Sequence, residues 1–291
     1  MPCVLAAVVG AASASASAGD LIGEPTAALT DQDETLLDVA HRHDVGYIEI
    51  RIANPSVDPW LPGAGRWINV PSQHILPNAL RRGIVVNLAE LRLYYFPFGQ
   101  RAPLSFPIGI GDEGKETPTG RTQVDSRRPN PTWIPTASEH AEDPDLPSMV
   151  RPGPDNPMGD FALYLGWKGF VIHGTNKPYS IGRRDSHGCI RMYPDDIRTL
   201  YRLVRPGTPV TVINQPVKTG WQDHELYLEI HPDVADADII ESGGTPQQPA
   251  PMETEALVRK AAGPREAARI DWDAVLAAAL ERNGIPVRVT R

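Results

Sequence analysis

The stretch from Val171 to Met192, VIHGTNKPYSIGRRDSHGCIRM, decides how the fold of this chain is interpreted. The apolar run that ends at His173 has the character of a buried strand, so this histidine is expected at the strand's exit. Gly188 precedes Cys189, which favours a tight turn with open backbone amides beside the cysteine. A thiolate, a histidine that forms it and amides that stabilise an oxyanion are the components of nucleophilic acyl transfer.

Two other interpretations of Cys189 follow from the residues alone. A single cysteine is often a buried packing residue without chemistry. Cys189 could also bind zinc together with His173 and His187, since thiolate and imidazole are common zinc ligands. Against zinc, His187 and Cys189 are closer together than paired zinc ligands usually are, and a fourth ligand would have to come from Asp185 or a distant residue.

The pair His173-Gly174 and the run SHGCIR, from Ser186 to Arg191, resemble the signature of the L,D-transpeptidase (YkuD-type) family of peptidoglycan enzymes. Residues 26 to about 232 resemble the periplasmic Gram-negative branch of that family, in which a LysM-like module precedes the catalytic domain. Further segments that carry the resemblance are ANP at 53–55, WINVP at 67–71, GIVVN at 83–87, PIGIG at 107–111, TPTG at 117–120 and GPDNPMG at 153–159.

The resemblance implies a fold that is mainly β with few helices, α+β overall. The catalytic domain, expected over residues 83–215, would be a YkuD-type β-sandwich, and a small LysM-like α+β module is expected over residues 24–77. A C-terminal extension over residues 216–291 would contain a linker at 243–251 and helices, because the linker is rich in proline and glutamine.

By the same resemblance, Cys189 is the nucleophile and His173 is the base that takes its proton. The carbonyl group of Gly174 would orient the imidazole, and the amides of Gly188 and Cys189 would form the oxyanion hole. His187 matches the second histidine of the motif, and it is expected to shape the site by hydrogen bonding rather than to act as the base.

Substrate-binding residues are predicted around this centre. Arg191 is expected to hold a carboxylate of the stem peptide, because a guanidinium pairs with a carboxylate in a bidentate fork. Ser186 is expected to tie the cysteine turn together by hydrogen bonding. The candidates to line the groove are Trp133, His140 and Tyr164.

The resemblance identifies the donor substrate as a tetrapeptide stem of peptidoglycan, cleaved between the L-centre of diaminopimelate and the terminal D-Ala. The acyl group would pass to an amine, either a second diaminopimelate, which gives a 3→3 cross-link, or a lysine of an outer-membrane lipoprotein. Water as the acceptor would make the protein an L,D-carboxypeptidase. Stem peptides and glycan are therefore the expected partners, and no metal or organic cofactor is implied.

The composition fits a chain that is rich in β-structure. Its 291 residues allow two or three domains, and its 30 prolines favour turns and extended segments over a helical bundle. The net charge of −8 argues against nucleic acid as a partner.

The first residues of the chain read as an export signal. Residues 1–18 hold an apolar run that is too short to span a bilayer and end in the small-residue cleavage sequence ASA. They predict a secretory signal peptide and a periplasmic location. Cleavage after Ala18 would remove Cys3 and leave Cys189 as the single cysteine, without a partner for a disulfide.

Secondary structure can be predicted along the rest of the chain. In the N-terminal region, Thr30 is expected to cap a helix that ends near residue 43, and a helix at 46–53 and a strand at 66–70 follow. The opening segment 26–29 is a poor strand by composition. In the catalytic region, strands are predicted at 84–88, 91–96, 104–110, 121–126, 161–165, 170–173 and 209–213, with the first two in a hairpin.

A single helix is predicted in the catalytic region, from Pro194 to about residue 204. The proline-rich segment 127–158 shows little periodicity and is expected as a long loop that covers the site like a lid. Beyond it, a strand at 225–231 is expected to complete the catalytic core as part of a hairpin. Two helices are predicted at 253–262 and 271–282, the second ended by Gly284.

Two other classes of protein compete with an active transpeptidase. A wall-binding LysM protein with an inactive cysteine site would not need the full motif, yet every one of its polar residues is present: His173, Ser186, His187, Cys189 and Arg191. A papain-like cysteine protease would place its cysteine before its histidine, and the order here is the reverse.

Overall fold

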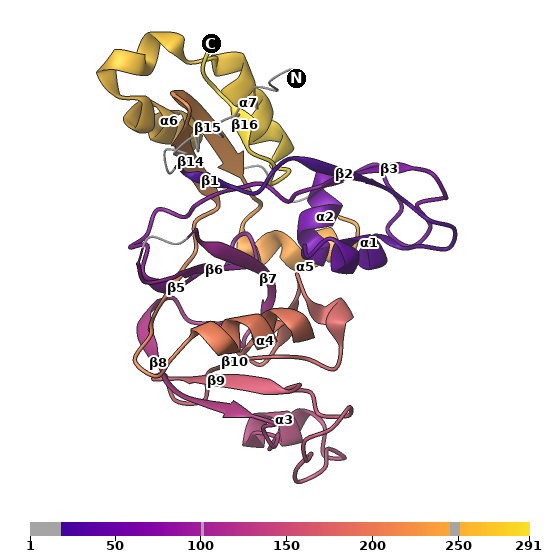
Figure 1. The fold of residues 1–291 in the computed structure, drawn as a ribbon. Helices are drawn as coiled ribbons and strands as arrows, with labels where there is room; N and C mark the ends of the chain where they lie inside the picture. Colours follow the sequence, from indigo (N-terminus) through magenta and orange to yellow (C-terminus); the bar gives the residue numbers. More distant parts are fainter. Residues whose placement is uncertain (1–18, 100–101, 245–250) are drawn as a thin grey trace, which may run out of the picture.

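The structure is a computed structural model that describes residues 19–99, 102–244 and 251–291. The expected signal peptide, residues 1–18, and most of the expected linker at 243–251 lie outside the described residues. Within the described ranges, three parts have hydrophobic cores of their own: a central β domain, an N-terminal module beside it and a C-terminal unit above it (Figure 1).

One sheet of nine strands forms the central domain, in the order β11-β7-β12-β10-β9-β8-β13-β5-β6. Strand β7 pairs with β6 along its first half and with β12 and β11 along its second half, so the sheet closes on itself. The strands are β5 (Gly83–Asn87), β6 (Arg92–Phe96), β7 (Leu104–Gly111), β8 (Gly120–Pro129), β9 (Phe161–Leu165), β10 (Val171–His173), β11 (Arg184–Ser186), β12 (Ile190–Met192) and β13 (Pro209–Ile213).

Closure of the sheet corrects one expectation and confirms others. The expected YkuD-type β-sandwich is corrected in one respect: β7 joins both halves into one continuous sheet, which leaves few open edges. The predicted strands are confirmed, with ends that differ by a few residues, and β5 and β6 form the expected antiparallel hairpin.

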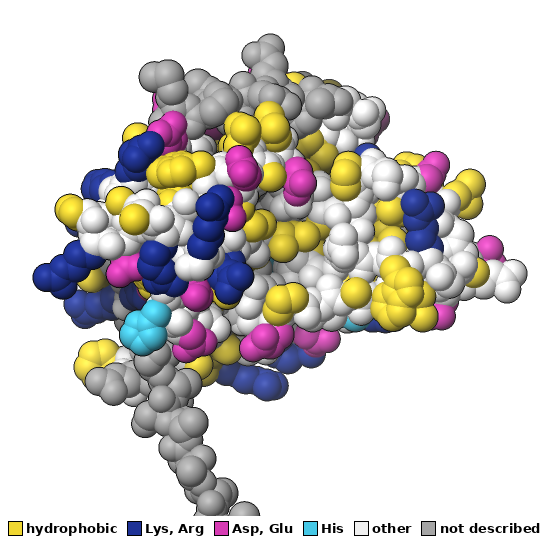
Figure 2. Space-filling view, turned by 90° about the horizontal axis from the view of Figure 1, so that it is seen from above, with side chains coloured by type: hydrophobic (Ala, Val, Ile, Leu, Met, Phe, Trp, Pro, Cys, Tyr) yellow, Lys and Arg dark blue, Asp and Glu magenta, His cyan; other side chains and the backbone are white. Residues whose placement is uncertain are grey.

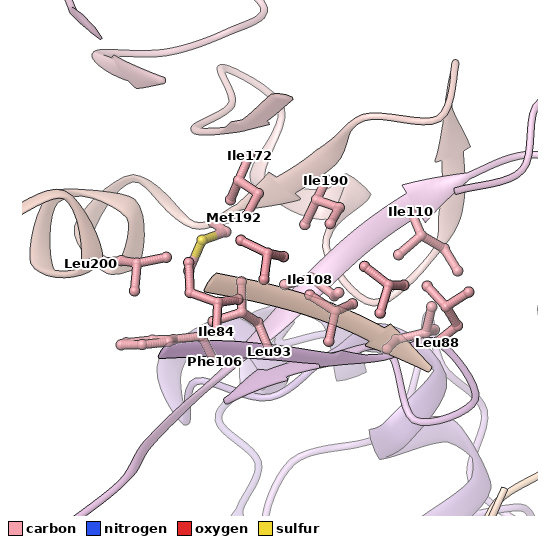
Figure 3. Packing of buried hydrophobic residues seen from close by; sticks show 14 of the residues in the cluster. Ile84, Leu88, Leu93, Phe106, Ile108, Ile110, Ile172, Ile190, Met192 and Leu200 are labelled. Carbon is pink, nitrogen blue, oxygen red and sulfur yellow. The ribbon is translucent and has the colours of Figure 1, made fainter. Parts of the chain in front are cut away.

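The core of the central domain lies inside the closed sheet. Side chains from β10 and β12 point toward side chains from β5, β6 and β7, and the two groups fill the space between the strands (Figure 3). Each buried aliphatic or aromatic side chain stabilises the fold by about 1.5–3 kcal/mol relative to an exposed one. The labelled members are Ile84, Leu88, Leu93, Phe106, Ile108, Ile110, Ile172, Ile190, Met192 and Leu200.

Helix α4 (Pro194–Leu203) covers one end of this core with its buried residues Ile197 and Leu200. Pro194 suits the first turn, where a missing N–H leaves no hydrogen bond unmade, and Asp195 complements the positive end of the helix dipole. The helix predicted from Pro194 is therefore confirmed, and it supports the strands that carry the cysteine and the histidine.

The N-terminal module has the order strand, helix, helix, strand: β2 (Thr26–Leu29), α1 (Leu36–Arg42), α2 (Tyr47–Ala53) and β3 (Trp67–Val70). The opening strand β2 forms in spite of its weak β sequence, because it pairs antiparallel with β3 along its whole length. Main-chain pairing and burial of Ala28 supply what the composition of the strand lacks.

The start of α1 corrects a second expectation. Thr35, and not Thr30, caps the helix: the Thr35 hydroxyl accepts a hydrogen bond from the Asp38 amide at 3.2 Å, and the Asp38 carboxylate accepts one from the Thr35 amide at 2.9 Å. Thr30 is buried, and its hydroxyl donates to the carbonyl oxygen of Gly63 at 2.5 Å. Thr30 therefore stabilises a loop of the module.

A buried ion pair fixes the N-terminal module to the central domain. Arg92 on β6 donates to both carboxylate oxygens of Glu49 on α2, each at 3.0 Å, and both side chains are almost completely buried. The guanidinium of Arg183 lies 4.0 Å from the ring centroid of Tyr47. Removal of one partner of such a pair typically costs about 3–5 kcal/mol, so the module is held in place.

The C-terminal unit is a three-stranded sheet with two helices packed on it. The sequence predicted that the hairpin of β14 and β15 completes the catalytic core. This prediction is wrong, because the hairpin pairs with β16, the last strand of the chain. Helix α7 ends at Glu281, and the residue that caps it is Arg282, in a left-handed conformation with φ 45°, rather than the expected Gly284. The elements are β14 (Val217–Gln222), β15 (Glu225–Ile230), α6 (Pro251–Glu266), α7 (Trp272–Glu281) and β16 (Val287–Arg288).

Short elements complete the fold. Strand β1 (Leu21–Ile22) pairs with β4 (His74–Ile75) between the central domain and the C-terminal unit, and α5 (Ala237–Glu241) packs near α2. Three single turns of 3-10 helix lie at Pro178–Ser180, Val234–Asp236 and Ala267–Arg269.

A buried polar network, here called the seam, joins the C-terminal unit to the central domain. The ammonium group of Lys218 on β14 lies 2.5 Å from Glu90, 2.8 Å from Glu229 and 2.7 Å from the Ile75 carbonyl oxygen. Tyr94 on β6 donates its hydroxyl to Glu90 at 2.8 Å. All three N–H donors of the lysine therefore have an acceptor in a region that water does not reach.

The N-terminal module also carries exposed apolar side chains. Figure 2 shows apolar side chains at the end of the molecule where this module lies. The large exposed ones in the module are Leu29, Trp60, Leu61 and Trp67. No helix in the described ranges is long and apolar enough to cross a membrane.

Candidate active site

A cleft of about 380 Å³ brings together the end of β10, the turn between β11 and β12, and the segment between β8 and β9. Strands β10 and β12 are parallel neighbours with His173 opposite Arg191, so the two halves of the motif meet at one end of the sheet. The predicted residues that line the cleft are Trp133, Tyr164, His173, Ser186, His187, Cys189 and Arg191.

Cys189 lies in the turn that leads into β12, with its side chain partly exposed toward the cleft. The thiol donates a weak hydrogen bond to the carbonyl oxygen of Gly169, with a sulfur–oxygen distance of 3.6 Å. Two hydroxyl groups hold the turn: Ser186 donates to the Cys189 carbonyl at 2.6 Å, and Thr117 donates to the Gly188 carbonyl at 2.9 Å. The backbone of the turn that carries the sulfur is therefore held at two successive carbonyl groups.

Gly188 is required by the backbone of this turn. Its φ of 95° lies in the left-handed region, which other residues rarely adopt. A Cβ atom at this position would lie 2.9 Å from the ring of Phe170, which is closer than carbon atoms can approach. A side chain here would therefore displace the cysteine that follows.

His173 is held by its own strand end. Its Nδ1 atom lies 2.6 Å from the carbonyl oxygen of Gly174, the group that the sequence analysis assigned to orient the imidazole. A carbonyl oxygen can only accept, so Nδ1 carries the proton and Nε2 is left as the basic nitrogen. Burial and, to a smaller extent, the charge of Arg191 lower the pKa of His173 to about 4, while the carbonyl groups of Gly174 and Met158 oppose the shift.

The pKa of the cysteine is shifted in the opposite direction. Burial raises the pKa of the Cys189 thiol, and a hydrogen bond from the Val171 amide lowers it. Among the charged groups, the Glu139 carboxylate raises this pKa and the Arg191 guanidinium lowers it. Since both pKa shifts favour the neutral forms, the cleft does not favour the preformed thiolate that the motif suggested. It favours a proton transfer that accompanies attack.

One wall of the cleft is positively charged. Arg191 lies there and pairs with Asp185 at 3.0 Å, where the Asp185 side chain is about half exposed. Arg128 lines the same cleft with its guanidinium 5.9 Å from the ring centroid of Tyr164, and no carboxylate of the described residues lies within ion-pair distance of it. This wall can therefore accept a carboxylate from a bound ligand.

The segment between β8 and β9 folds over the cleft, as expected of a lid, but it is not a structureless loop. Trp133 and Val150 form an antiparallel bridge, and α3 (Ala137–Glu142) begins after a capping box made by Thr136. The amide group of the buried Asn156 donates to three main-chain carbonyl oxygens of this segment. The lid is therefore an ordered structure whose shape is set by its own hydrogen bonds.

His187 connects the cysteine turn to the lid. Its Nε2 atom lies 2.9 Å from Glu142 and 3.0 Å from the ammonium nitrogen of Lys115, and its Nδ1 atom lies 3.8 Å from Glu139. Lys115 in turn pairs with Glu142 at 2.6 Å. These contacts agree with the hydrogen-bonding role that the sequence analysis gave to His187, and the ring already engages other partners than the thiol.

Not every predicted groove residue reaches the cleft. Trp133 and Tyr164 line it, whereas His140 on α3 does not. The residues that line it and were not predicted from the sequence include Arg128, Glu139 and Met158. The spacing of Thr136 and Glu139 is a capping-box pattern and could have signalled a helix in the lid, but the sequence offers no signal for Arg128.

The zinc interpretation of the motif is not supported by the geometry. Among the described residues, the group of three that could hold a metal ion is His74, Glu90 and Glu229, which lies in the seam, where both carboxylates pair with the ammonium group of Lys218. His173, His187 and Cys189 do not form such a group.

Comparison with known proteins shows the family. Residues 81–212 match the YkuD model, the L,D-transpeptidase catalytic domain. The probable L,D-transpeptidase YbiS of Escherichia coli K12 is 40% identical over 257 residues, which cover 86% of this chain and 81% of that protein. The probable L,D-transpeptidase YcfS of the same strain is 44% identical over 221 residues, which cover 72% of this chain and 69% of that protein. The probable L,D-transpeptidase ErfK/SrfK of Salmonella typhimurium is 45% identical over 219 residues, with 72% and 71% covered.

Solved structures are similar over part of the chain. The L,D-transpeptidase 3 of Mycobacterium tuberculosis is 17% identical and covers 66% of this chain and 93% of that chain, with a TM-score of 0.35. The family assignment therefore rests on the sequence relatives.

Proposed function

This chain belongs to the L,D-transpeptidase family, and we propose that it is an active member whose nucleophile is Cys189 and whose base is His173. The observation that carries the proposal is the common cleft of these two residues, in which the Gly174 carbonyl already orients the imidazole at 2.6 Å. The tautomer that this hydrogen bond selects leaves Nε2 available to accept the proton of the thiol.

The first half-reaction forms a thioester. The Cys189 sulfur attacks the carbonyl carbon of the bond between diaminopimelate and D-Ala, and the thiol proton passes to Nε2 of His173. The amides of Gly188 and Cys189 stabilise the oxyanion, at about 2.7–4 kcal/mol per donor in comparable sites. The imidazolium then gives its proton to the leaving amine, the C–N bond breaks, and D-Ala departs.

The positive wall of the cleft selects the donor. A stem peptide carries carboxylates close to the scissile bond, and Arg191 and Arg128 provide guanidinium groups beside the nucleophile. The ion pair of Arg191 with the half-exposed Asp185 is weak enough to exchange for a substrate carboxylate. Trp133 and Tyr164 supply apolar surface for the stem, and Ser186 holds the turn.

The second half-reaction transfers the acyl group to an amine. A diaminopimelate of a second stem would give a 3→3 cross-link, and a lysine of an outer-membrane lipoprotein would give an anchored wall. Water in place of the amine would give a carboxypeptidase, which is the second candidate activity. Residues of the lid line the cleft together with Cys189, so a bound acceptor can contact them, whereas water gains little from such contacts.

The N-terminal module is proposed to be a LysM-like unit that binds glycan. Its strand-helix-helix-strand order and its exposed Trp60 and Trp67 support this, since aromatic rings can pack on sugar faces. The buried Glu49–Arg92 pair would then hold a glycan strand at a fixed position relative to the cleft. Such a substrate places the protein outside the cytoplasm, with residues 1–18 as its export signal.

Mass spectrometry of muropeptides tests the proposal. The purified protein is incubated with disaccharide-tetrapeptides that contain diaminopimelate, and the products are separated and fragmented. Loss of D-Ala together with a dimer linked between two diaminopimelates is expected. Unchanged tetrapeptide in the presence of folded protein would sink the proposal and favour a wall-binding protein with an inactive site.

A further inference from the structure

We propose that Glu139, on the lid helix α3, binds the ammonium group of the acyl acceptor and thereby favours transfer to an amine over hydrolysis. The inference rests on the proposed function, because it assigns the acceptor side of the same cleft. Glu139 lines the cleft together with Cys189 and His173, and its side chain is only 16% exposed.

The Glu139 carboxylate is fixed by its own helix start. One oxygen, Oε2, accepts hydrogen bonds from the Thr136 amide at 2.6 Å and from the Thr136 hydroxyl at 2.9 Å. The other oxygen, Oε1, is 3.8 Å from Nδ1 of His187, which is beyond hydrogen-bonding distance. The capping box therefore holds the group in place and leaves one oxygen with spare capacity to accept.

Glu139 has no cationic side chain of its own. Among the described residues, no lysine or arginine lies within ion-pair distance of it; Lys115 pairs with Glu142 instead, and His187 lies 3.8 Å away. A partly buried carboxylate without a cation costs desolvation energy that a bound ammonium group would offset.

The charges of the cleft come from different elements: Arg128 and Arg191 lie on strands β8 and β12, and Glu139 lies on the lid helix α3. Arg128 and Arg191 line the cleft together with Glu139, and Cys189 is close enough to Arg191 and Glu139 for both charges to act on its thiol. A donor stem presents carboxylates, and an acceptor presents an ammonium group, so the two substrates match opposite charges. Water carries no charge and gains nothing from Glu139, which makes the residue a determinant of specificity.

The role of Glu139 in the reaction is to bind and position the acceptor. The bound ammonium loses one proton to solvent, and the amine nitrogen then attacks the thioester carbonyl. The N–C bond forms, the C–S bond breaks, and the second amine proton passes through Nε2 of His173 to the sulfur. Glu139 makes no covalent bond in these steps.

The test compares Glu139→Gln with Glu142→Gln. Glutamine can still complete the capping box, so E139Q removes the charge and keeps the helix start. E142Q removes a charge of the same helix that does not line the cleft. Three quantities are measured: the acyl-enzyme mass with a tetrapeptide donor, the KM for a lysine- or diaminopimelate-containing acceptor, and the ratio of transfer to hydrolysis.

For E139Q, an increase of about tenfold in acceptor KM is expected, with a matching fall in the ratio of transfer to hydrolysis. The acyl-enzyme forms as in the wild type, and transfer to hydroxylamine, which is uncharged at neutral pH, is unchanged. An unaltered acceptor KM in E139Q, an equal rise in E142Q or an equal loss with hydroxylamine would overturn the inference while the proposed function stands. Failure of the wild type to form an acyl-enzyme would overturn both.

Discussion

The cleft and the seam both bury ionisable side chains, but they leave them in opposite states. In the seam, the Lys218 ammonium is surrounded by Glu90, Glu229 and a main-chain carbonyl, and it is inaccessible to water. In the cleft, burial shifts the pKa values of the His173 imidazole and the Cys189 thiol in the directions that keep both groups neutral. The paired charges of the seam join the C-terminal unit to the central domain. The thiol and the imidazole of the cleft form no ion pair with any described residue and remain available to a substrate.

The electrostatics of the seam agree with this division. Burial favours the neutral forms, but the opposite charges prevail: the pKa of Glu229 is held well below its usual range by Lys218, and the pKa of Lys218 is raised by Glu229 and Glu90. Both groups therefore stay charged at neutral pH and below. In the cleft, His173 is kept neutral instead, since the charge of Arg191 lowers its pKa in the same direction as burial does.

The largest expected effect is in the cleft, on Cys189→Ala and Cys189→Ser. Acyl transfer should fall by at least about a thousandfold, because no other group in the cleft replaces the sulfur as nucleophile. The thermal midpoint should change little, since the side chain is small and partly exposed. Muropeptide turnover and differential scanning calorimetry measure the two quantities.

Reaction with a carbapenem tests the same variants independently. Its strained lactam imitates the scissile amide and its carboxylate can pair with Arg191, so the wild type should gain the mass of the intact drug on Cys189. Neither variant should form this adduct stably. Near-wild-type turnover in either variant would show that the nucleophile lies elsewhere.

The second largest effect is expected for His173→Ala. Loss of the base should lower turnover by about 10²–10⁴-fold, and the rate of alkylation of Cys189 should recover as pH rises and solvent takes the proton. His187→Ala should show a smaller loss and no such recovery, because His187 contacts Glu142 and Lys115 on the lid side.

His231 provides a matched control for the histidine of the cleft. It is also buried, but it lies near the seam, with Nε2 2.7 Å from Glu229. His231→Ala should lower the thermal midpoint and leave the pH dependence of alkylation as in the wild type. A pH-dependent rescue in His187→Ala and not in His173→Ala would reverse the roles assigned here.

Sequence reasoning identified the residues whose position depends on their neighbours in the chain. His173 ends an apolar run, and Cys189 follows a glycine, so strand exit and turn could be read directly. The strands β9 and β13 were predicted to the residue because their β-branched and aromatic content is bounded by turn residues.

The features that depend on distant parts of the chain were missed. Closure of the sheet depends on β7 pairing with strands on both sides, which no local pattern records. Thr30 and Thr35 are each followed three residues later by an aspartate, and only the contact of Thr30 with Gly63 decides which one caps the helix. Arg128 reaches the cleft because β8 pairs with β9, and Glu139 reaches it because the lid folds back over it.

The seam is expected to determine stability rather than chemistry. Lys218→Met would leave the carboxylates of Glu90 and Glu229 buried without their cation, which should destabilise the protein by about 3–5 kcal/mol. Chemical denaturation followed by tryptophan fluorescence measures this change. Acyl transfer per folded molecule should stay close to the wild-type value, because the seam does not line the cleft.

An exposed ion pair serves as the control for the seam. Arg259 pairs with Glu255 at 2.6 Å, and both side chains are about half exposed. Arg259→Met should change the free energy of unfolding little, since exposed pairs contribute on the order of 0–1 kcal/mol. Equal destabilisation by the two variants would show that burial does not distinguish the seam from the surface.

The smallest expected effect is a shift in the pH profile of the cleft. Protonated His173 cannot accept the thiol proton, so the acylation rate should fall as pH decreases through its pKa of about 4, well below the usual value of 6.5. The charge of Arg191 is one cause of the lowered pKa. Arg191→Ala should therefore move the acid limb to higher pH, by less than about 1 pH unit because burial is the larger cause.

Arg191→Lys separates the charge of the wall from its hydrogen-bonding geometry. Lysine keeps the positive charge, so the acid limb should stay near its wild-type position, while donor binding weakens because the bidentate fork is lost. Carbapenem acylation of each variant, measured by intact-protein mass spectrometry between pH 3.5 and 8 at constant ionic strength, gives the midpoint separately from the maximal rate. An acid limb with its midpoint near pH 6.5 in the wild type, or one that does not move in Arg191→Ala, would contradict the prediction. It would show that the cleft does not keep its histidine neutral in the way that the seam keeps its lysine charged.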